Sequence, residues 1–374
     1  MIDVVTPAAV VDVAKMRANI SRMVGHIHSL NAAFRPHVKT AKSVPVTRAI
    51  LEAGGRGITV STLKEAGEFF ASGITDILYA VGMAEQKLPQ CLELMRKGCD
   101  LGIITDNVDS ARAIAAFGVA NGVCFKVLIE VDTDGHRSGV LPESEDLIAV
   151  ARALALPGAE LRGVLTHAGS SYELDTPEAL AAMAEQERAL TVRAAERLRE
   201  NGFTCPVVSV GSTPTALSAR NLDGVTEVRA GVFVFFDLVM HNVGVCGLDD
   251  IALSVLGTVI GHQKEKGWAI VDAGWMAMSR DRGTAKQKHD FGYGQVCDED
   301  GMVLPGFIMV GANQEHGIIA SEKEAVTDIA EQFPIGTRVR ILPNHACATG
   351  AQFPEMQAVF PDGSSEVWPR FYGW

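Results

Sequence analysis

The sequence predicts an α/β protein in which a (β/α)8 TIM-type barrel precedes a C-terminal β domain. Three observations support this fold class. The chain has 374 residues, which is longer than one average domain. Up to about residue 240, short β-rich runs alternate with stretches of helical period, which indicates a parallel sheet. From about residue 245, strand-like runs follow one another with little helical period, so we expect domains over residues 1–244 and 245–374.

Eight β-rich runs make up the predicted barrel, and a clear helical pattern follows seven of them. Eight such units in about 230 residues match a closed barrel better than an open doubly wound sheet, which is the alternative. The dinucleotide motif GxGxxG after a first strand and the phosphate-loop motif GxxxxGK[ST] are both absent. The runs cover residues 33–39, 57–62, 76–83, 100–106, 125–133, 161–169, 206–212 and 227–237.

The predicted β domain consists of strands joined by turns such as Asp300-Gly301 and Asp362-Gly363. Its first and fourth runs read "IALSVLGTVIGHQ" and "GTRVRILPNHACATG". The first strand of the whole chain is a further candidate member of this domain.

Composition and charge narrow the class of protein. Hydrophobic residues make up 47% and charged residues 21%, as in ordinary globular proteins. The formal charge of −12 argues against nucleic acid or an anionic membrane as the main partner. The seven cysteines are scattered without a CxxC pair, and we find neither a signal peptide nor an apolar run that could cross a bilayer. We therefore expect a cytoplasmic protein that binds a small molecule.

The stretch "RPHVKT" (residues 35–40) places three nitrogen-bearing side chains on alternate positions. In an extended strand, Arg35, His37 and Lys39 share one face. Taken alone, the stretch is better explained as an exposed basic edge, because exposed Lys and Arg are common. The other interpretation is a lysine that needs a cationic neighbourhood, which would favour its neutral, nucleophilic form.

Further polar residues follow the ends of the predicted strands, where a barrel of this kind carries its active site. Each one alone is explained by a helix cap, close packing or a buried histidine. Together they offer an anion site at a helix start, arginines, an imidazole and a lysine. That combination suits pyridoxal phosphate, which forms a Schiff base with a lysine. The candidates are Ser61, Thr62, Asp132, His136, Arg137, His167, Tyr172, residues 211–214, Arg229 and Gly231.

These motifs resemble the alanine-racemase-like, fold-type III pyridoxal phosphate enzymes. The match extends over nearly the whole chain and looks closer still to the branch of D-serine dehydratases and D-threonine aldolases. The matching stretches are "RPHVKTAKSV", "GITVSTLKEA", "DTDGHRSGV", "THAGSSYE", "VGSTPTA" and "LPNHACATG". The resemblance implies a barrel joined to a β domain, and usually a homodimer.

The resemblance also implies roles for individual residues. Lys39 would hold the cofactor as a Schiff base and later serve as the base at Cα. Arg137 would face the phenolic oxygen of the cofactor, His167 would lie against its ring, and Arg229 would face the pyridine nitrogen. Tyr172 and Arg280 are the candidates for reading the substrate. The phosphate would be held by Gly211, Ser212, Thr213, Gly231 and Val232.

His345 and Cys347 form a second candidate site. They share one face if the stretch is extended, and by spacing alone a core cysteine beside a polar histidine is the better explanation. The resemblance implies instead a divalent metal held by this His-x-Cys pair. A thiolate favours Zn²⁺, with Mn²⁺ or Mg²⁺ less natural. Cysteine at this position is typical of the dehydratases of the branch, whereas the aldolases tend to carry aspartate.

The activity implied by the resemblance is dehydration of D-3-hydroxy amino acids. We expect D-threo-3-hydroxyaspartate to give oxaloacetate and ammonia, with D-serine and D-threonine as further substrates. The alternative is a D-threonine aldolase, which would release glycine and an aldehyde. A non-catalytic pyridoxal phosphate carrier is disfavoured by the β domain and by the His-x-Cys pair.

Overall fold

The computed structural model describes residues 3–323 and 328–374. The chain divides into two units. The barrel unit comprises Ser21–Gly231 with Phe371–Trp374, and the β unit comprises the chain up to Ile20 with Val232–Arg370.

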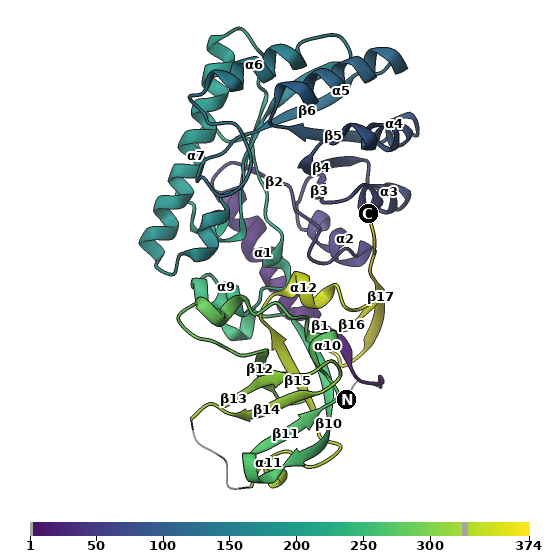
Figure 1. The fold of residues 1–374 in the computed structure, drawn as a ribbon, viewed down its shortest axis with the longest axis vertical. Helices are drawn as coiled ribbons and strands as arrows, with labels where there is room; N and C mark the ends of the chain where they lie inside the picture. Colours follow the sequence, from purple (N-terminus) through teal and green to yellow (C-terminus); the bar gives the residue numbers. More distant parts are fainter. Residues whose placement is uncertain (1–2, 324–327) are drawn as a thin grey trace. The chain divides into compact units, whose positions relative to one another are not determined.

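Eight parallel strands form the sheet of the barrel unit (Figure 1), which confirms the predicted fold class. Their order is β2-β9-β8-β7-β6-β5-β4-β3, and every pairing in it is parallel. A parallel bridge between His37 and Thr59 joins the two ends of this order, so the sheet closes. The strands are β2 (Ala33–Phe34), β3 (Ile58–Val60), β4 (Asp76–Gly82), β5 (Asp100–Thr105), β6 (Phe125–Glu130), β7 (Ala159–Leu165), β8 (Val207–Val210) and β9 (Glu227–Val228).

Helices follow the strands and lie outside the sheet (Figure 1). Several begin at a hydroxyl or amide side chain that accepts a backbone N–H of the first turn, as Thr62 does for Glu65 and Thr176 for Ala179. α5 packs so closely on the loop before β7 that a Cβ at Gly118 would overlap the Gly158 carbonyl. The helices are α2 (Val44–Glu52), α3 (Leu63–Ala71), α4 (Leu88–Arg96), α5 (Val108–Asn121), α6 (Glu145–Leu154), α7 (Pro177–Glu200) and α8 (Thr213–Ser218); α1 (Val13–Ser29) precedes β2.

The interior of the barrel is packed with aliphatic side chains from neighbouring strands. Leu78, Ile104, Leu128 and Leu165 form one buried cluster, with one residue from each of β4 to β7. Stacked layers of this kind fill a barrel and leave no pore.

The eighth predicted run of the barrel, residues 227–237, is only partly a strand. β9 has two residues, and Val232–Val234 form a 3-10 turn instead of continuing the sheet. Asp237 then caps α9 (Leu238–Val243) by accepting the N–H of Met240. The long strand predicted here was therefore wrong beyond Val228, because an apolar run can also be a buried turn.

Nine strands form the sheet of the β unit, in the order β11-β14-β13-β12-β15-β10-β1-β16-β17. β11 also pairs with β10, which curls part of the sheet upon itself. β1 (Ala8–Asp12) lies between β10 and β16, and its pairing with β16 is the parallel one. The others are β10 (Leu253–Gln263), β11 (Trp268–Val271), β12 (Gly294–Cys297), β13 (Val303–Ala312), β14 (Gly317–Ser321), β15 (Arg338–Pro343), β16 (Glu355–Val359) and β17 (Ser365–Pro369).

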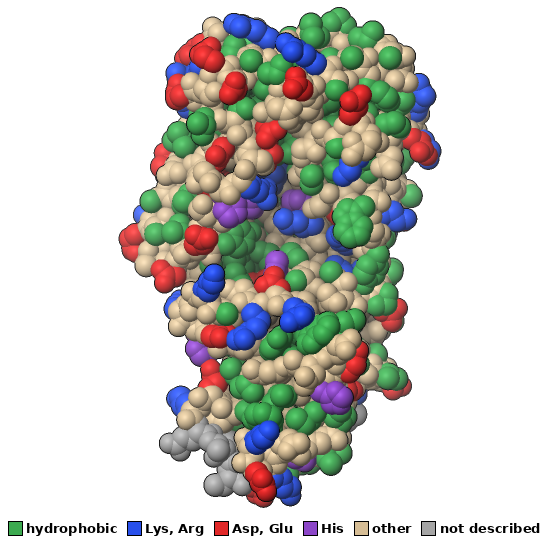
Figure 2. Space-filling view, viewed as in Figure 1, with side chains coloured by type: hydrophobic (Ala, Val, Ile, Leu, Met, Phe, Trp, Pro, Cys, Tyr) green, Lys and Arg blue, Asp and Glu red, His purple; other side chains and the backbone are tan. Residues whose placement is uncertain are grey.

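Short helices interrupt the β unit. They are α9, described above, with α10 (Trp275–Met278), α11 (Ile329–Gln332) and α12 (Ala346–Gly350). The stretch "HACATG" was expected to be extended, but α12 starts directly after His345, so most of it is helical. Among the helices that the structure describes, none combines the length and the apolar character needed to cross a membrane. Figure 2 shows that acidic and basic side chains are interspersed over the face it presents.

Candidate active site

Lys39 lies just beyond the carboxyl end of the first barrel strand. The chain turns at residues 38–41, directly after the bridge residue His37. The Nδ1 atom of His37 accepts the backbone N–H of Lys39 at 3.4 Å. Within the described residues, the Lys39 amino group makes no hydrogen bond or ion pair. A half-buried amine without a partner at this end of a barrel is a candidate nucleophile.

Two imidazoles and two guanidinium groups share the neighbourhood of Lys39. Burial lowers the pKa of His37 well below its usual value, and the charges of Lys39 and Arg229 lower it further. Burial and the charges of Lys39 and Arg137 lower the pKa of His167 to about 3. Both imidazoles are therefore neutral near pH 7, and the positive charges that act on them belong to Lys39, Arg137 and Arg229. This excess of positive charge suits an anionic ligand.

His167 has a defined tautomer and a defined aromatic neighbour. Its Nδ1–H donates to the Gly211 carbonyl at 3.0 Å, which leaves Nε2 as an acceptor. The ring of Tyr172 lies 6.1 Å from the ring of His167, at an angle of 45°. The structure therefore brings His167, Tyr172 and Gly211 together.

The Gly-Ser-Thr loop connects β8 to α8. The Ser212 hydroxyl accepts the N–H of Thr215 at 3.2 Å, and the Thr215 hydroxyl accepts the N–H of Ser212 at 3.0 Å. Ser212 and Thr213 are buried. Gly211 has a φ of +131°, and a Cβ there would overlap the Arg229 carbonyl, so close backbone approach alone explains this glycine.

Arg229 is buried beside the same loop. Its Nε donates to the Ser209 hydroxyl at 2.9 Å, and its terminal nitrogen donates to the Thr166 carbonyl. Gly231 follows two residues later, where a Cβ would lie 2.9 Å from the His37 carbonyl. Val232, which begins the 3-10 turn, is buried. Arg229 and Gly231 therefore connect the end of β9 with the strands that carry Ser209 and His37.

Glu187 of α7 is a site residue that sequence reasoning missed. One of its carboxylate oxygens accepts the N–H of Ala168 at 2.9 Å and the N–H of Gly211 at 3.1 Å. The side chain is 2% exposed, and burial raises the pKa of its carboxyl. Glu187 therefore joins the loop that carries His167 to the Gly-Ser-Thr loop. A charged residue on the apolar face of α7, in step with Leu180 and Ala194, was the available signal.

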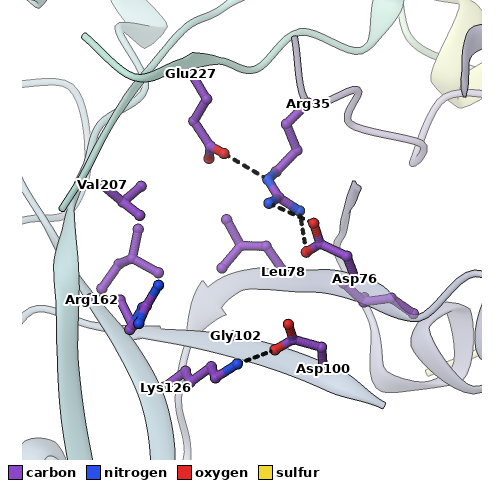
Figure 3. A pocket seen from close by; sticks show the side chains of 11 residues that line it. Arg35, Asp76, Leu78, Asp100, Gly102, Lys126, Arg162, Val207 and Glu227 are labelled. Carbon is purple, nitrogen blue, oxygen red and sulfur yellow. Dashed lines mark hydrogen bonds and ion pairs between the residues drawn. The ribbon is translucent and has the colours of Figure 1, made fainter. Parts of the chain in front are cut away.

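Arg35 is paired with two carboxylates in a cavity of its own. Its guanidinium bonds Asp76 at 2.8 Å and Glu227 at 2.9 Å in a cavity of about 190 Å³ (Figure 3). The lining includes the first residues of β4, β5, β8 and β9, so the cavity opens at the amino ends of the strands. Arg35 and Lys39 do not share one face of an extended strand, because β2 ends at Phe34 and the chain turns at residues 38–41.

The ion pairs in this cavity balance its charges, as in the pair between Lys126 and Asp100 at 2.7 Å (Figure 3). Residues at the amino ends of barrel strands generally serve stability rather than catalysis. We therefore assign this cavity a structural role.

The candidate metal pair lies where β15 leads into α12. His345 precedes the first turn of the helix and Cys347 lies within it. Burial alone lowers the pKa of His345, but the Cys347 thiolate and the hydrogen bonds with Asp281 and Cys347 raise it to about 11. Both side chains are partly accessible to solvent. An imidazole nitrogen and a thiolate sulfur close together and open to water are suitable donors for a divalent metal.

The surroundings of this pair contain two carboxylates. The Nδ1 of His345 bonds the Oδ2 of Asp281 at 2.6 Å. Asp237 is buried, and its Oδ2 accepts the N–H of Ala346 at 2.9 Å. Within residues 3–323 and 328–374, no cluster of three or more His, Cys, Asp or Glu side chains has metal-binding geometry. A metal here would therefore have two protein ligands and complete its shell with water or substrate.

Arg280, a candidate for reading the substrate, is exposed next to this loop. Its guanidinium lies 5.2 Å from the centre of the Trp275 ring. Its neighbour Asp281, which the sequence analysis passed over, makes the contact with His345.

Comparison with known proteins identifies relatives that match nearly the whole chain. Residues 11–239 match the family model described as alanine racemase, N-terminal domain, and residues 252–359 match the putative serine dehydratase domain. The D-threo-3-hydroxyaspartate dehydratase of Delftia sp. (strain HT23) is 66% identical over 371 residues, covering 99% of this chain and 98% of the relative. The D-serine dehydratase of Dictyostelium discoideum is 30% identical, covering 96% and 94%.

A solved structure provides the third comparison. It is a D-threo-3-hydroxyaspartate dehydratase in which one cysteine is replaced by alanine, described as the metal-free form. It matches with a TM-score of 0.99 at 65% identity, covering 100% of this chain and 99% of that one. The similarity therefore includes both units.

Proposed function

The chain belongs to the alanine-racemase-like family that includes the D-threo-3-hydroxyaspartate and D-serine dehydratases, and from this premise we propose a dehydratase of D-3-hydroxy amino acids. The reaction depends on pyridoxal 5'-phosphate and a divalent metal. The preferred substrate is D-threo-3-hydroxyaspartate, which gives oxaloacetate and ammonia, and D-serine and D-threonine react as well. The observation that carries the proposal is the unpaired Lys39 amine among Arg137, Arg229 and two neutral imidazoles.

The residues at the barrel mouth fit the cofactor through their chemistry. The Lys39 amine is the group that bonds its aldehyde carbon, and the cationic surplus suits its phosphate. Pyridoxal phosphate, when bound, withdraws electrons from Cα of an amino acid and so makes the Cα proton acidic. The holding residues are Lys39, Arg137, His167, Tyr172, Gly211, Ser212, Thr213, Arg229, Gly231 and Val232.

The side chains have separate tasks in this proposal. Lys39, once its amine is released, takes the Cα proton of the D-substrate. His167 supports the cofactor ring. Its Nδ1–H bonds the Gly211 carbonyl, and this bond holds the imidazole in place. Arg229 offers a permanently charged donor to the pyridine nitrogen, and its own bonds to Ser209 and Thr166 hold it in place. Tyr172 lies beside His167 and contacts the cofactor or the substrate.

His345 and Cys347 hold the metal in this proposal. The thiolate favours Zn²⁺ over Mn²⁺ or Mg²⁺. The metal supplies Lewis acidity that stabilises a departing hydroxide. The metal-free form described for a cysteine-to-alanine variant of a dehydratase supports a metal role for Cys347.

The proposal also includes the cellular location and the oligomeric state. The seven cysteines are all free thiols in the structure, which supports a reducing, cytoplasmic location. The family resemblance supports a homodimer, and the molecular mass in solution tests it. The chain itself is 39.8 kDa.

A panel of D- and L-3-hydroxy amino acids, with and without a chelator, tests the reaction. We expect ammonia and a 2-oxo acid from the D isomers, and loss of both products when the metal is removed. Glycine and an aldehyde without ammonia would identify a D-threonine aldolase instead. Cofactor bound without turnover of any D-amino acid would identify a carrier.

Lys39→Ala tests the cofactor site directly. The variant should lose both its activity and the near-visible absorbance of the bound cofactor, because that absorbance requires the bond between the cofactor and the Lys39 amine. Lys64→Ala is the matched control, since Lys64 is an exposed lysine whose ion pair is with Glu68. An unchanged absorbance band in Lys39→Ala refutes the assignment.

A further inference from the structure

Asp281 contacts the imidazole of His345 on its Nδ1 side. The Oδ2 of Asp281 lies 2.6 Å from Nδ1 of His345. A carboxylate accepts hydrogen bonds, so Nδ1 donates its N–H to Asp281, and Nε2 is the nitrogen that remains for a metal. An outer carboxylate of this kind orients a histidine ligand and fixes its tautomer.

The loop that carries Asp281 is fastened to the segment that carries His345. On one side, the Thr349 hydroxyl donates to the Met278 carbonyl at 2.7 Å. On the other, the Thr284 hydroxyl donates to the Asn344 side-chain oxygen at 2.7 Å. Asp281 lies between these two fastenings, so its distance to His345 is set by the surrounding structure.

Ser279 adds a strained residue to the same loop. Its φ of 67° and ψ of 166° fall in a region that glycine alone usually occupies. Its hydroxyl accepts the N–H of Asp281 at 3.1 Å. Non-glycine residues keep such a conformation only where their surroundings hold it, and they cluster at functional sites.

The backbone of the metal pair is held from the opposite side. Asp237 accepts the N–H of Ala346, the residue between His345 and Cys347, at 2.9 Å. The same carboxylate accepts the N–H of Met240 at 3.0 Å, which ties the pair to α9. Backbone and imidazole are therefore oriented independently, by Asp237 and by Asp281.

We propose that Asp281 is a positioning residue for the metal site: it fixes the tautomer and the orientation of His345 so that Nε2 can bind a divalent cation beside Cys347. Asp281 is not itself a ligand, because its Oδ2 is engaged by the non-ligating nitrogen. The inference rests on the proposed function of His345 and Cys347, and it adds a residue to which that function assigns no role.

The experiment measures metal binding by the cofactor-loaded enzyme after chelator treatment. Zn²⁺ affinity is measured by titration calorimetry, and Co²⁺ reports the cysteine ligand through its thiolate absorbance band. We expect Asp281→Ala to weaken Zn²⁺ binding by about 10–100-fold. Asp281→Asn, whose amide oxygen can accept the same N–H, should recover most of that loss. Asp290→Ala removes a nearby carboxylate that pairs with Arg282 and should leave the affinity unchanged.

The outcomes separate this inference from the function on which it rests. Wild-type affinity in Asp281→Ala overturns the positioning role. Loss of the metal from Asp281→Asn as complete as from His345→Ala also overturns it, because Asp281 would then be a ligand. A wild-type enzyme that binds no Zn²⁺ and no Co²⁺ refutes the proposed metal site itself. Asp281→Asn keeps the size of the side chain, so it serves as the test if Asp281→Ala does not fold.

Discussion

Glu187 holds together the two loops that carry half of the proposed cofactor contacts. One carboxylate oxygen accepts the N–H of Ala168 at 2.9 Å and that of Gly211 at 3.1 Å, and the side chain is 2% exposed. Glu187→Ala removes this oxygen and leaves both N–H groups buried without an acceptor. Each unsatisfied donor costs about 1–3 kcal/mol, so the unfolding free energy should fall by about 2–6 kcal/mol.

Thermal unfolding of the cofactor-free protein, followed by circular dichroism, measures this loss. At about 2–4 °C per kcal/mol, the Tm should fall by at least about 4 °C. Glu187→Gln keeps one oxygen for both N–H groups and should remain close to the wild type. Glu185→Ala is the matched control, because Glu185 lies on the same helix but is exposed and pairs with Arg188.

The pH dependence gives a second readout for Glu187. Burial raises the pKa of its carboxyl above the ordinary value for glutamate. The stability that this group contributes is therefore complete at low pH and declines as the pH rises above about 4.5. The side chain in Glu187→Gln does not titrate. The Tm of this variant, relative to that of the wild type, should therefore increase as the pH rises. A Glu187→Ala variant that melts within about 1 °C of the Glu185→Ala control would refute the reasoning.

Two further substitutions test the electrostatics of the barrel unit. The pKa of His167 is lowered to about 3, so its contribution to stability is complete above about pH 6.5 and is lost as the pH falls towards 3. Urea titrations of the cofactor-free wild type should therefore show a fall in unfolding free energy between about pH 7.5 and 5. His167→Gln does not titrate, so its fall over the same range should be smaller by roughly 2 kcal/mol. Parallel pH profiles of the two proteins would contradict this. Arg35→Met should lower the unfolding free energy by about 1–3 kcal/mol, because it leaves Glu227 and Asp76 without their ion-pair partner. The absorbance band of the bound cofactor should stay unchanged. An altered band would place Arg35 at the active site.

Hydrophobic period and turn chemistry were sufficient to predict the barrel and the strand-rich C-terminal part. All eight predicted barrel strands are present, because alternation of short apolar runs with amphipathic helices has few other solutions. The exception is the run after Val228, where consecutive buried residues form a turn. An apolar run has no period that distinguishes a buried strand from a buried turn.

The candidate site divides into residues with a local signal and residues without one. Lys39, Arg137 and His167 follow strand ends, and parallel strands bring such positions to one end of a barrel. Arg35 follows the same strand, but its partners Asp76 and Glu227 lie 41 and 192 residues away, a pairing that no local pattern contains. Asp281 was missed for the same reason, because its contact with His345 depends on a long-range fold.

The central claim is that this chain eliminates water from a D-3-hydroxy amino acid and does not cleave its Cα–Cβ bond. The most direct measurement follows ammonia, oxaloacetate and glycine together in one reaction of the cofactor- and metal-loaded enzyme with D-threo-3-hydroxyaspartate. We predict equal amounts of ammonia and oxaloacetate, no glycine, and no product from the L isomer. Formation of glycine and glyoxylate without ammonia would contradict it.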